Sequence, residues 1–171
     1  MLDKYKPNVI IHLGQQSSAS FSMMNVDNAV LTQTNNLVTT LNVLHAIKNV
    51  VPNCHLIKLG SMGEYGTPNI DIPEGLLEIE YRGRIAKLPF PKQAFNDWYH
   101  WSKVYDSDNI MMACQIWGLR STDVMQGIVY GTRTDETSSD SLFTRFDFDA
   151  IFGTVINRFC AQAVLGHRLT P

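Results

Sequence analysis

Two short apolar runs constrain the fold of this chain more than any other feature. Val9-Ile10-Ile11-His12-Leu13 lies between Pro7 and Gly14, and His55-Leu56-Ile57-Lys58-Leu59 ends at Gly60. Continuous runs of this length are typical of parallel strands that are covered on both faces. The two runs are therefore predicted to lie side by side in one parallel sheet.

Segments with helical spacing alternate with these strands. Apolar residues recur at that spacing from about residue 28 to 50, from about Ala94 to Met112, and from Ile151 to Ala163. The segments Gln115–Arg120 and Gly127–Tyr130 are predicted to be further strands. The alternation indicates an α/β fold with a doubly wound, Rossmann-like parallel sheet.

A proline-punctuated insertion interrupts the alternating pattern at about residues 67–92. Within it, Leu76–Tyr81 and Ile85–Leu88 flank an Arg82-Gly83 turn, which predicts a small hairpin. Ligands of parallel α/β sheets bind at the carboxyl ends of the strands. The polar segments at those ends are Gly14–Ser18, Ser61–Glu64 and Gln126–Gly131.

The composition excludes several classes of function. A net charge of −2 over 171 residues gives no electrostatic basis for binding nucleic acid or an anionic membrane. No apolar run is long enough for membrane insertion. Cys54, Cys114 and Cys160 show neither a C-x-x-C nor a zinc-binding spacing, which indicates reduced thiols and no metal site.

Tyr99 and Lys103 form a Y-x-x-x-K pattern within a predicted helix, so their side chains share one face. A phenol, with a pKa near 10, becomes a useful base where a nearby ammonium favours the phenolate. Ser61 follows the preceding strand and offers a hydroxyl to a substrate. The Tyr/Lys spacing also arises by chance, and Ser61 also suits a helix cap. The hypothesis of a proton-transfer site therefore depends on the order of the elements: a strand, a hydroxyl-bearing residue at its end, and then the helix with the Tyr/Lys pair.

That order resembles the core of the short-chain dehydrogenase/reductases. The segment N-N-L-V-T-T-L-N-V-L at 35–44 resembles a helix of their extended members, which mostly act on nucleotide sugars. S-M-G-E-Y-G-T-P-N-I-D-I at 61–72 is similar to the signature of the UDP-sulfoquinovose synthase family. Further similar segments lie at 90–94, 99–103, 126–131, 134–136 and 152–160, so that the resemblance covers essentially the whole chain.

The resemblance implies a reaction of UDP-glucose and sulfite that depends on NAD. NAD takes a hydride from C4, water leaves across C5 and C6, sulfite adds at C6, and the hydride returns. On the matching positions Tyr99 is the base, Lys103 tunes it and holds the nicotinamide ribose, and Ser61 binds the C4 oxygen. Three neighbouring residues are further catalytic candidates: Met62, Glu64 and His100.

The resemblance also implies two sets of ligand contacts. The NAD set consists of Gly14, Gln15, Gln16, Asn35, Tyr99, Lys103 and Gln126. The substrate set consists of Ser61, Gly63, Glu64, Gln126 and Asn157.

Three of these candidates also have a purely structural interpretation. Related 4,6-dehydratases carry Asp and Glu at the positions of Met62 and Gly63, whereas Glu64 comes one residue later here. Met62 also suits core packing, and Glu64 suits a solvated loop. His100 suits either the protein surface or a supporting contact, besides acting as an acid or steering sulfite.

The chain departs from the family pattern at four positions. Gln15 replaces the usual Glu, Ser17 the usual Arg, Ser61 the usual Thr, and Met125 the usual Asn. Loss of the Arg removes a fixed cation near the anionic ligands. Whether this segment contacts sulfite and the substrate as in the family is therefore an open question.

No strand–G-x-x-G-x-x-G–helix unit, which would hold the NAD pyrophosphate, opens the sequence. Gly60, Gly63 and Gly66 have that spacing, but Thr67-Pro68 follows, where no helix can start. We therefore expect an incomplete fold, without the first βαβ unit and the C-terminal substrate domain. Residues 1–171 then form a partial NAD(P)-binding domain, and the sugar-nucleotide-binding region begins at about 132–171.

Other functions remain open at this point. Another NAD-dependent nucleotide-sugar epimerase or 4,6-dehydratase is the nearest alternative, followed by a non-catalytic dinucleotide-binding relative and an unrelated α/β binding module. The resemblance implies a homodimer formed through the long helices. It leaves open whether sulfite arrives free or from a partner protein, and whether the protein acts in the cytoplasm or the plastid stroma.

Overall fold

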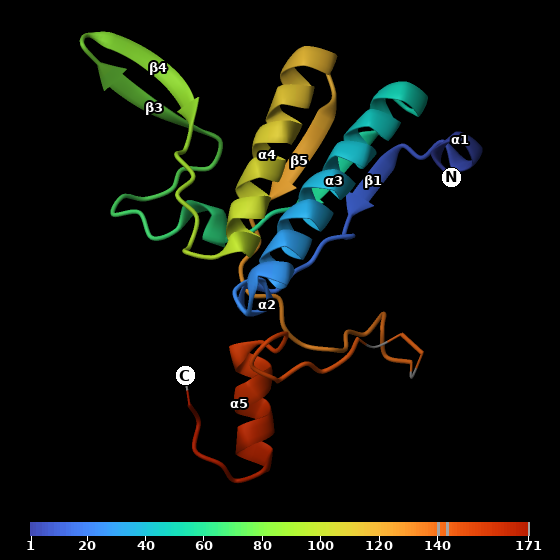
Figure 1. Cartoon of the computed structure of the whole chain (residues 1–171), viewed down its shortest axis with the longest axis vertical. Coiled ribbons are helices and arrows are strands. Elements are labelled where there is room, and N and C mark those ends of the chain that lie inside the picture. Colours follow the sequence, from blue (N-terminus) through green and yellow to red (C-terminus); the bar gives the residue numbers. More distant parts are fainter. Residues whose placement is uncertain (140, 143, 171) are drawn as a thin grey trace.

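Three parallel strands form the centre of the fold, and the computed structural model describes residues 1–139, 141–142 and 144–170. The strands are β1 (Val9–His12), β2 (His55–Leu59) and β5 (Arg120–Val124), with β2 between the other two (Figure 1). Ile10 pairs in register with Leu56 and Leu56 with Ser121. The predicted parallel α/β fold is confirmed.

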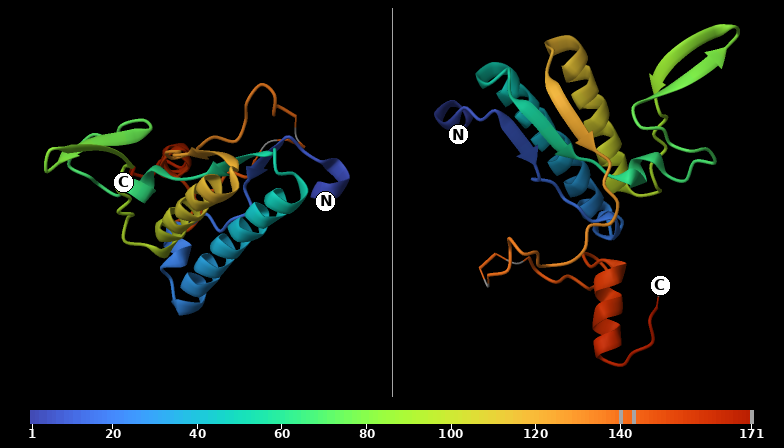
Figure 2. Two further views of the ribbon diagram at one scale, coloured as in Figure 1. Left: turned by 90° about the horizontal axis from the view of Figure 1, so that it is seen from above. Right: turned by 180° about the vertical axis from the view of Figure 1, so that it is seen from behind.

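Two long helices, α3 (Val26–Val50) and α4 (Trp98–Trp117), lie side by side on one face of this sheet (Figure 2). Asn25 begins α3, since its side chain accepts a hydrogen bond from the Asn28 amide at 2.9 Å. Helix termini leave backbone amides without partners, so a polar side chain at this position stabilises the first turn.

The limits of α4 correct two predictions. The helix begins at Trp98, not near Ala94, because the side chain of Asp97 caps it. It continues to Trp117 and ends at Gly118, whose φ of 66° suits a glycine. Residues 115–117 are therefore helical, and the strand predicted at 115–120 instead runs from Arg120 to Val124.

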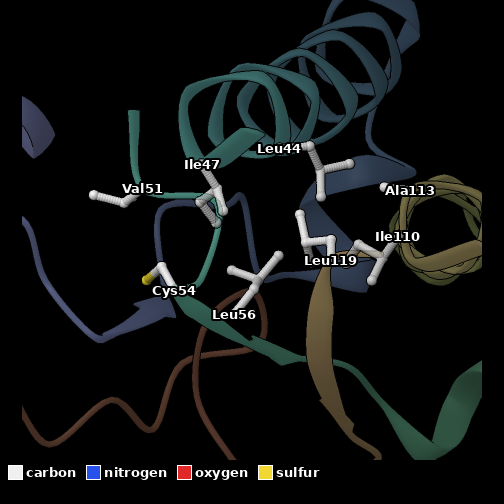
Figure 3. Packing of buried hydrophobic residues seen from close by; sticks show 8 residues of the cluster. All are labelled: Leu44, Ile47, Val51, Cys54, Leu56, Ile110, Ala113 and Leu119. Carbon is white, nitrogen blue, oxygen red and sulfur yellow. The ribbon is translucent and has the colours of Figure 1, made fainter. Parts of the chain in front are cut away.

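The hydrophobic core lies between the two helices and the sheet (Figure 3). It is formed by buried residues of α3, α4 and β2 and of the segments that flank them: Leu44, Ile47, Val51, Cys54, Leu56, Ile110, Ala113 and Leu119. Burial of one leucine side chain contributes about 2 kcal/mol, so this cluster fixes how the helices sit on the strands.

The opposite face of β1 corrects the expectation that this strand is covered on both sides. Val9 is 50% exposed and Ile11 is 57% exposed, whereas His12 is buried. Side chains alternate between the faces of a strand, and α3 and α4 both cover the same face. Within the residues that the structure describes, no helix therefore covers the face of β1 that carries Val9 and Ile11.

The predicted hairpin is present as the antiparallel strands β3 (Leu76–Tyr81) and β4 (Arg84–Pro89). Arg82 and Gly83 form its turn with φ angles of 51° and 72°. Positive φ at both turn positions matches the right-handed twist of the flanking strands. The hairpin projects away from the parallel sheet (Figure 1).

The shorter elements are α1 (Leu2–Tyr5), α2 (Ala19–Ser22), the 3-10 helix η1 (Met62–Tyr65) and, at the far end of the chain, α5 (Val155–Val164). The segment before α5 contacts the loop before α2: Ser18 Oγ donates to the Ile151 carbonyl, and the rings of Phe21 and Phe152 lie 6.0 Å apart. The strand predicted at 127–130 is absent; these residues are exposed and irregular. No helix in the described part of the chain is both long and apolar enough to cross a membrane.

Candidate active site

The segments that follow β2 and β5 are joined to the start of α4. The Met62 amide donates to the Gln126 carbonyl at 3.0 Å, and the Phe95 amide donates to the Gly63 carbonyl at 3.2 Å. These bonds arise because the carboxyl ends of parallel strands lie at one edge of the sheet. The structure thus brings the predicted site residues of η1 next to the beginning of the helix that carries Tyr99.

Ser61 is held in one conformation by the first turn of η1. Its hydroxyl oxygen accepts from the Gly63 amide at 3.1 Å, and the Glu64 carboxylate accepts from the Ser61 amide at 3.0 Å. This reciprocal capping box fixes both the backbone and the side chain of Ser61. The hydroxyl hydrogen of Ser61 has no acceptor among the described residues, so it can donate to a ligand.

Tyr99 and Lys103 are both buried and share one face of α4, as predicted. The Lys103 ammonium lies 5.7 Å from the centre of the Tyr99 ring. It donates to the Leu59 carbonyl at 2.8 Å and to Oε1 of Gln15, which leaves one of its three N–H groups for a ligand. Burial, together with the charge of Lys58, lowers the pKa of Lys103 to about 8.

The pKa of Tyr99 differs from the sequence-based expectation that Lys103 brings it into a useful range. Burial, together with the negative charges of Glu64 and Asp97, raises the pKa of Tyr99 to about 12. The ammonium of Lys103 is bound to other acceptors and does not offset the loss of hydration. The phenol is therefore neutral at pH 7.

His100 is not a surface residue, because its ring is enclosed by the first turn of α4. Nδ1 lies 2.7 Å from Asp97 Oδ2, and the ring packs edgewise on Tyr99 and Phe95 with centroid distances of 4.8 and 5.3 Å. A methyl group added to Gly63 would overlap the Nε2 side of the imidazole. The ring nitrogen that Asp97 does not bind is thus directed at η1.

Glu64 is completely buried, which excludes the interpretation as a solvated loop acid. Its carboxylate accepts from Lys58 at 3.1 Å, from Lys92 at 2.6 Å and from Ser107 at 2.7 Å. Burial alone would raise the pKa of Glu64, but the two lysines and the hydrogen bonds hold it below its usual value. Glu64 is therefore ionised and points into the protein interior.

Sequence reasoning missed the partners of Glu64. Lys58, Lys92, Ser107 and Asp123 form one hydrogen-bonded and ionic cluster with it, in which Ser107 Oγ also lies 2.6 Å from Asp123 Oδ2. One signal was available in β2, where Lys58 lies two residues after Leu56 and so shares its inward-facing side of the strand. A lysine at such a position needs a carboxylate partner.

The loop after β1 contacts α3 through Gln16 and Asn36. The Gln16 amide donates to Asn36 Oδ1 at 2.8 Å, and Asn36 Nδ2 donates to the Gln16 carbonyl at 3.1 Å. Asn35, the predicted cofactor contact, donates to Asn36 Oδ1 at 3.1 Å and so supports this pair. Gly14 is exposed, and a methyl group there would meet only His12, at 3.8 Å, so the loop leaves its backbone open at this point.

Three other candidates have different surroundings. Met62 is 59% exposed, which excludes core packing, and Gln126 is half-buried beside it. Asn157 lies in α5, where it is buried and donates to the Asp147 carbonyl at 3.1 Å. The side chain of Asn157 thus bonds within its own segment and joins none of the contacts around Tyr99.

A hollow of about 990 Å³ lies at the base of the hairpin, next to the Glu64 cluster. Tyr65, Lys92, Ser107 and Asp123 are among its lining residues, whereas Tyr99 and Lys103 are not. We assign the chemistry to the neighbourhood of Tyr99, because size alone does not supply groups that transfer protons.

The sequence profile of the NAD dependent epimerase/dehydratase family matches residues 1–146. The chain is 54% identical over 167 residues to a chloroplastic UDP-sulfoquinovose synthase of Spinacia oleracea, and 47% identical over 171 residues to a UDP-sulfoquinovose synthase of Sulfolobus acidocaldarius. These alignments cover 97% and 99% of this chain, which spans 34% and 43% of the two relatives. Among solved structures, a UDP-glucose 4-epimerase of Thermus thermophilus in complex with NAD superimposes with a TM-score of 0.65 at 23% identity, over 97% of this chain and 44% of that one.

Proposed function

Since the chain belongs to the NAD dependent epimerase/dehydratase family, we propose that it is part of a UDP-sulfoquinovose synthase. Such a protein joins sulfite to the sugar of UDP-glucose by way of a 4-keto intermediate. The sequence identity to two proteins of that name supports this choice over an epimerase. The observation that carries it is the placement of Tyr99 and Lys103 on one buried helix face, with the start of that helix hydrogen-bonded to the turn that fixes the Ser61 hydroxyl.

The residues present fit the nicotinamide half of NAD. Lys103 retains one N–H group for a ribose hydroxyl, and the exposed backbone at Gly14 allows close approach of a ligand. Gly60 does not serve a phosphate, because a methyl group there would overlap Asp123 and Glu64; it permits close packing within the buried cluster. We assign Gln15, Gln16, Asn35 and Gln126 to the cofactor side of the site. When bound, NAD supplies a group that reversibly accepts a hydride from C4 of the sugar.

Within this proposal the chain's own residues move the protons. Tyr99 takes the proton of the C4 hydroxyl through its phenol oxygen and later returns it, and Ser61 donates a hydrogen bond to the C4 oxygen. The cation of Lys103 favours the phenolate when the ligands exclude water. The raised pKa of Tyr99 is compatible with this role, because bound NAD and sugar would complete the surroundings of the phenol.

We assign the proton transfers at C5 and C6 to His100. Its Nδ1 is held by Asp97, so Nε2 is free to accept or donate a proton on the side of Gly63. Glu64 acts through Ser61, because it accepts from the Ser61 amide and points away from the site. Met62 presents an exposed thioether beside Gln126, and we place the approach of sulfite along this surface.

The assembly and location are parts of the same proposal. The outer faces of α3 and α4 carry the exposed apolar residues Val30, Val38, Tyr105 and Met112, which supports a homodimer through these helices. We place the start of a sugar-nucleotide-binding region at about 132–171, with Asn157 as a substrate contact. The protein acts in the cytoplasm or plastid stroma, on sulfite that is free or delivered by a partner protein.

Mass spectrometry of reaction products tests the function. The intact protein is incubated with UDP-glucose, NAD and sulfite, and a sulfonated UDP-sugar is expected. Accumulation of UDP-galactose or of a 4-keto-6-deoxy sugar, with no sulfonated product, would instead identify an epimerase or a 4,6-dehydratase. A reaction without sulfite serves as the control, since it must yield no sulfonated product.

A further inference from the structure

Asp106 is a buried carboxylate that forms no ion pair within the part of the chain that the structure describes. It lies in α4, three residues after Lys103, and its Oδ1 has no hydrogen-bond partner among those residues. Burial raises the pKa of Asp106 to about 6 against the opposing effect of a hydrogen bond from Gln15, so the group is charged at neutral pH. The charges of Lys58 and Lys103 only partly offset the burial of Asp106, which forms no close ion pair, so its ionised form does not contribute to stability.

The side chain of Gln15 connects Asp106 to Lys103. Its Nε2 donates to Asp106 Oδ2 and lies 3.1 Å from Thr40 Oγ1 and 3.3 Å from the Asn36 carbonyl. Its Oε1 accepts from the Lys103 ammonium. A side-chain amide has one donor end and one acceptor end, so the acceptors around Nε2 oblige the amide oxygen to face the lysine.

We propose that Asp106 is a positioning residue that fixes the ammonium of Lys103 through the side-chain amide of Gln15. This inference rests on the proposed function, in which Lys103 serves Tyr99 and the cofactor. Lysine ends in a flexible stem, so its nitrogen is placed only by the groups that accept from it. The Leu59 carbonyl is one such group, and the oriented Gln15 amide is the other.

The consequence of losing Asp106 follows from the polarity of the amide. Without the carboxylate, the Gln15 side chain is less restrained and can turn its NH₂ group towards the ammonium, which repels it. A displacement of a catalytic group by about 1 Å costs up to about 100-fold in rate. We therefore expect Asp106→Leu to lower kcat about 10- to 100-fold with little change in the KM for UDP-glucose.

Three variants of the intact protein separate positioning from a structural role. Asp106→Leu removes the acceptor, Asp106→Asn keeps an oxygen that can accept from Gln15, and Gln15→Met removes the bridge. Asp106→Leu should not lower the thermal unfolding temperature, because it removes an unpaired buried charge. Asp106→Asn should recover most of the kcat that Asp106→Leu loses, since the hydrogen bond to Gln15 is kept.

The double variant provides the decisive comparison. If Asp106 acts through Gln15, adding Asp106→Leu to Gln15→Met causes little further loss of kcat. Multiplicative losses in the double variant would overturn the proposal, and so would a lower unfolding temperature that accounts for the lost activity. Should Asp106→Leu fail to fold, Gln15→Met still decides, because an unchanged kcat in that variant also overturns the proposal.

A labelling experiment tests the connection independently of turnover. The protein is treated with a limiting amount of a lysine-methylating reagent, and peptide mass spectrometry compares Lys103 with the exposed Lys87. Lys103 should react several-fold faster in Asp106→Leu and in Gln15→Met than in the unaltered protein. In the double variant it should react no faster than in either single variant. An unchanged Lys103 labelling rate would overturn the positioning role. If labelling changes as expected but no sulfonated sugar forms in any variant, the proposed function fails and the positioning role stands.

Discussion

Lys58 and Glu64 form an ion pair in which Nζ and Oε1 are 3.1 Å apart and both side chains are completely buried. Lys58 comes from the central strand, whereas Glu64 comes from the turn that caps Ser61. The pair therefore links the sheet to the conformation of the candidate catalytic hydroxyl. Because water does not reach either group, the loss of one partner leaves the other charge only partly compensated.

Lys58→Met should destabilise the protein strongly. Removal of one partner from a buried pair costs about 3 kcal/mol or more, whereas an exposed pair contributes less than about 1 kcal/mol. Lys87→Met is the matched control, because Lys87 and Glu78 are 3.8 Å apart with side chains 68% and 61% exposed. Urea unfolding of both variants measures the difference. Equal unfolding free energies would show that the Lys58 pair contributes no more than the surface pair.

Glu64→Gln should change how stability depends on pH. The folded-state pKa of Glu64 lies below its usual value, so its ionised form adds stability above about pH 4.3 that is lost as the pH falls through the folded pKa. In Glu64→Gln this part of the acid-induced loss should disappear, and stability at pH 7 should be lower. Urea unfolding at pH 7 and at a series of pH values below 5 measures both effects. A variant that retains the full acid sensitivity would assign it to other carboxylates.

Tyr99→Phe should abolish turnover with little loss of substrate binding. The substitution keeps the ring and removes only the hydroxyl, and proton transfer by a positioned group contributes about 100-fold or more in rate. Tyr105→Phe is the control, since Tyr105 lies on the same helix but is exposed. Calorimetric titration with UDP-glucose, beside the product assay, separates binding from catalysis. Unchanged turnover in Tyr99→Phe would remove this residue from the mechanism.

Gly63→Ala should impair the protein through His100. The added methyl group overlaps the imidazole, so the ring must leave its hydrogen bond with Asp97 or the turn must shift. We expect a loss of about 1–3 kcal/mol in stability, typical of overpacking, and a lower kcat.

The double variant Gly63→Ala, His100→Ala provides the control for this effect. In the His100→Ala background the ring is absent, so the second substitution should cost less than it does alone. Thermal unfolding and kcat of the three proteins measure the coupling. Equal costs in both backgrounds would locate the effect in the backbone of η1 rather than in the ring.

The sequence by itself determined the elements that depend on local patterns. The apolar run at 55–59 is a strand at its predicted limits, and the Arg82-Gly83 turn joins the predicted hairpin strands. The sequence also predicted that Ser61 and Tyr99 belong to one candidate site, because the carboxyl ends of parallel strands lie at one edge of an α/β sheet. The strand predicted at 115–120 was wrong, because α4 continues to Trp117 and is capped at Gly118, whereas the pattern predicted its end at about Met112.

Only the tertiary structure decided which polar groups meet inside the protein. Glu64 turned inward to Lys58, and Gln15 came between Asp106 and Lys103, although these partners lie far apart or on different elements along the chain. The sequence spacing also could not show that burial, rather than Lys103, dominates the pKa of Tyr99. Local patterns fix backbone conformation, whereas the charge state of a buried group depends on every dipole and ion that packing places around it.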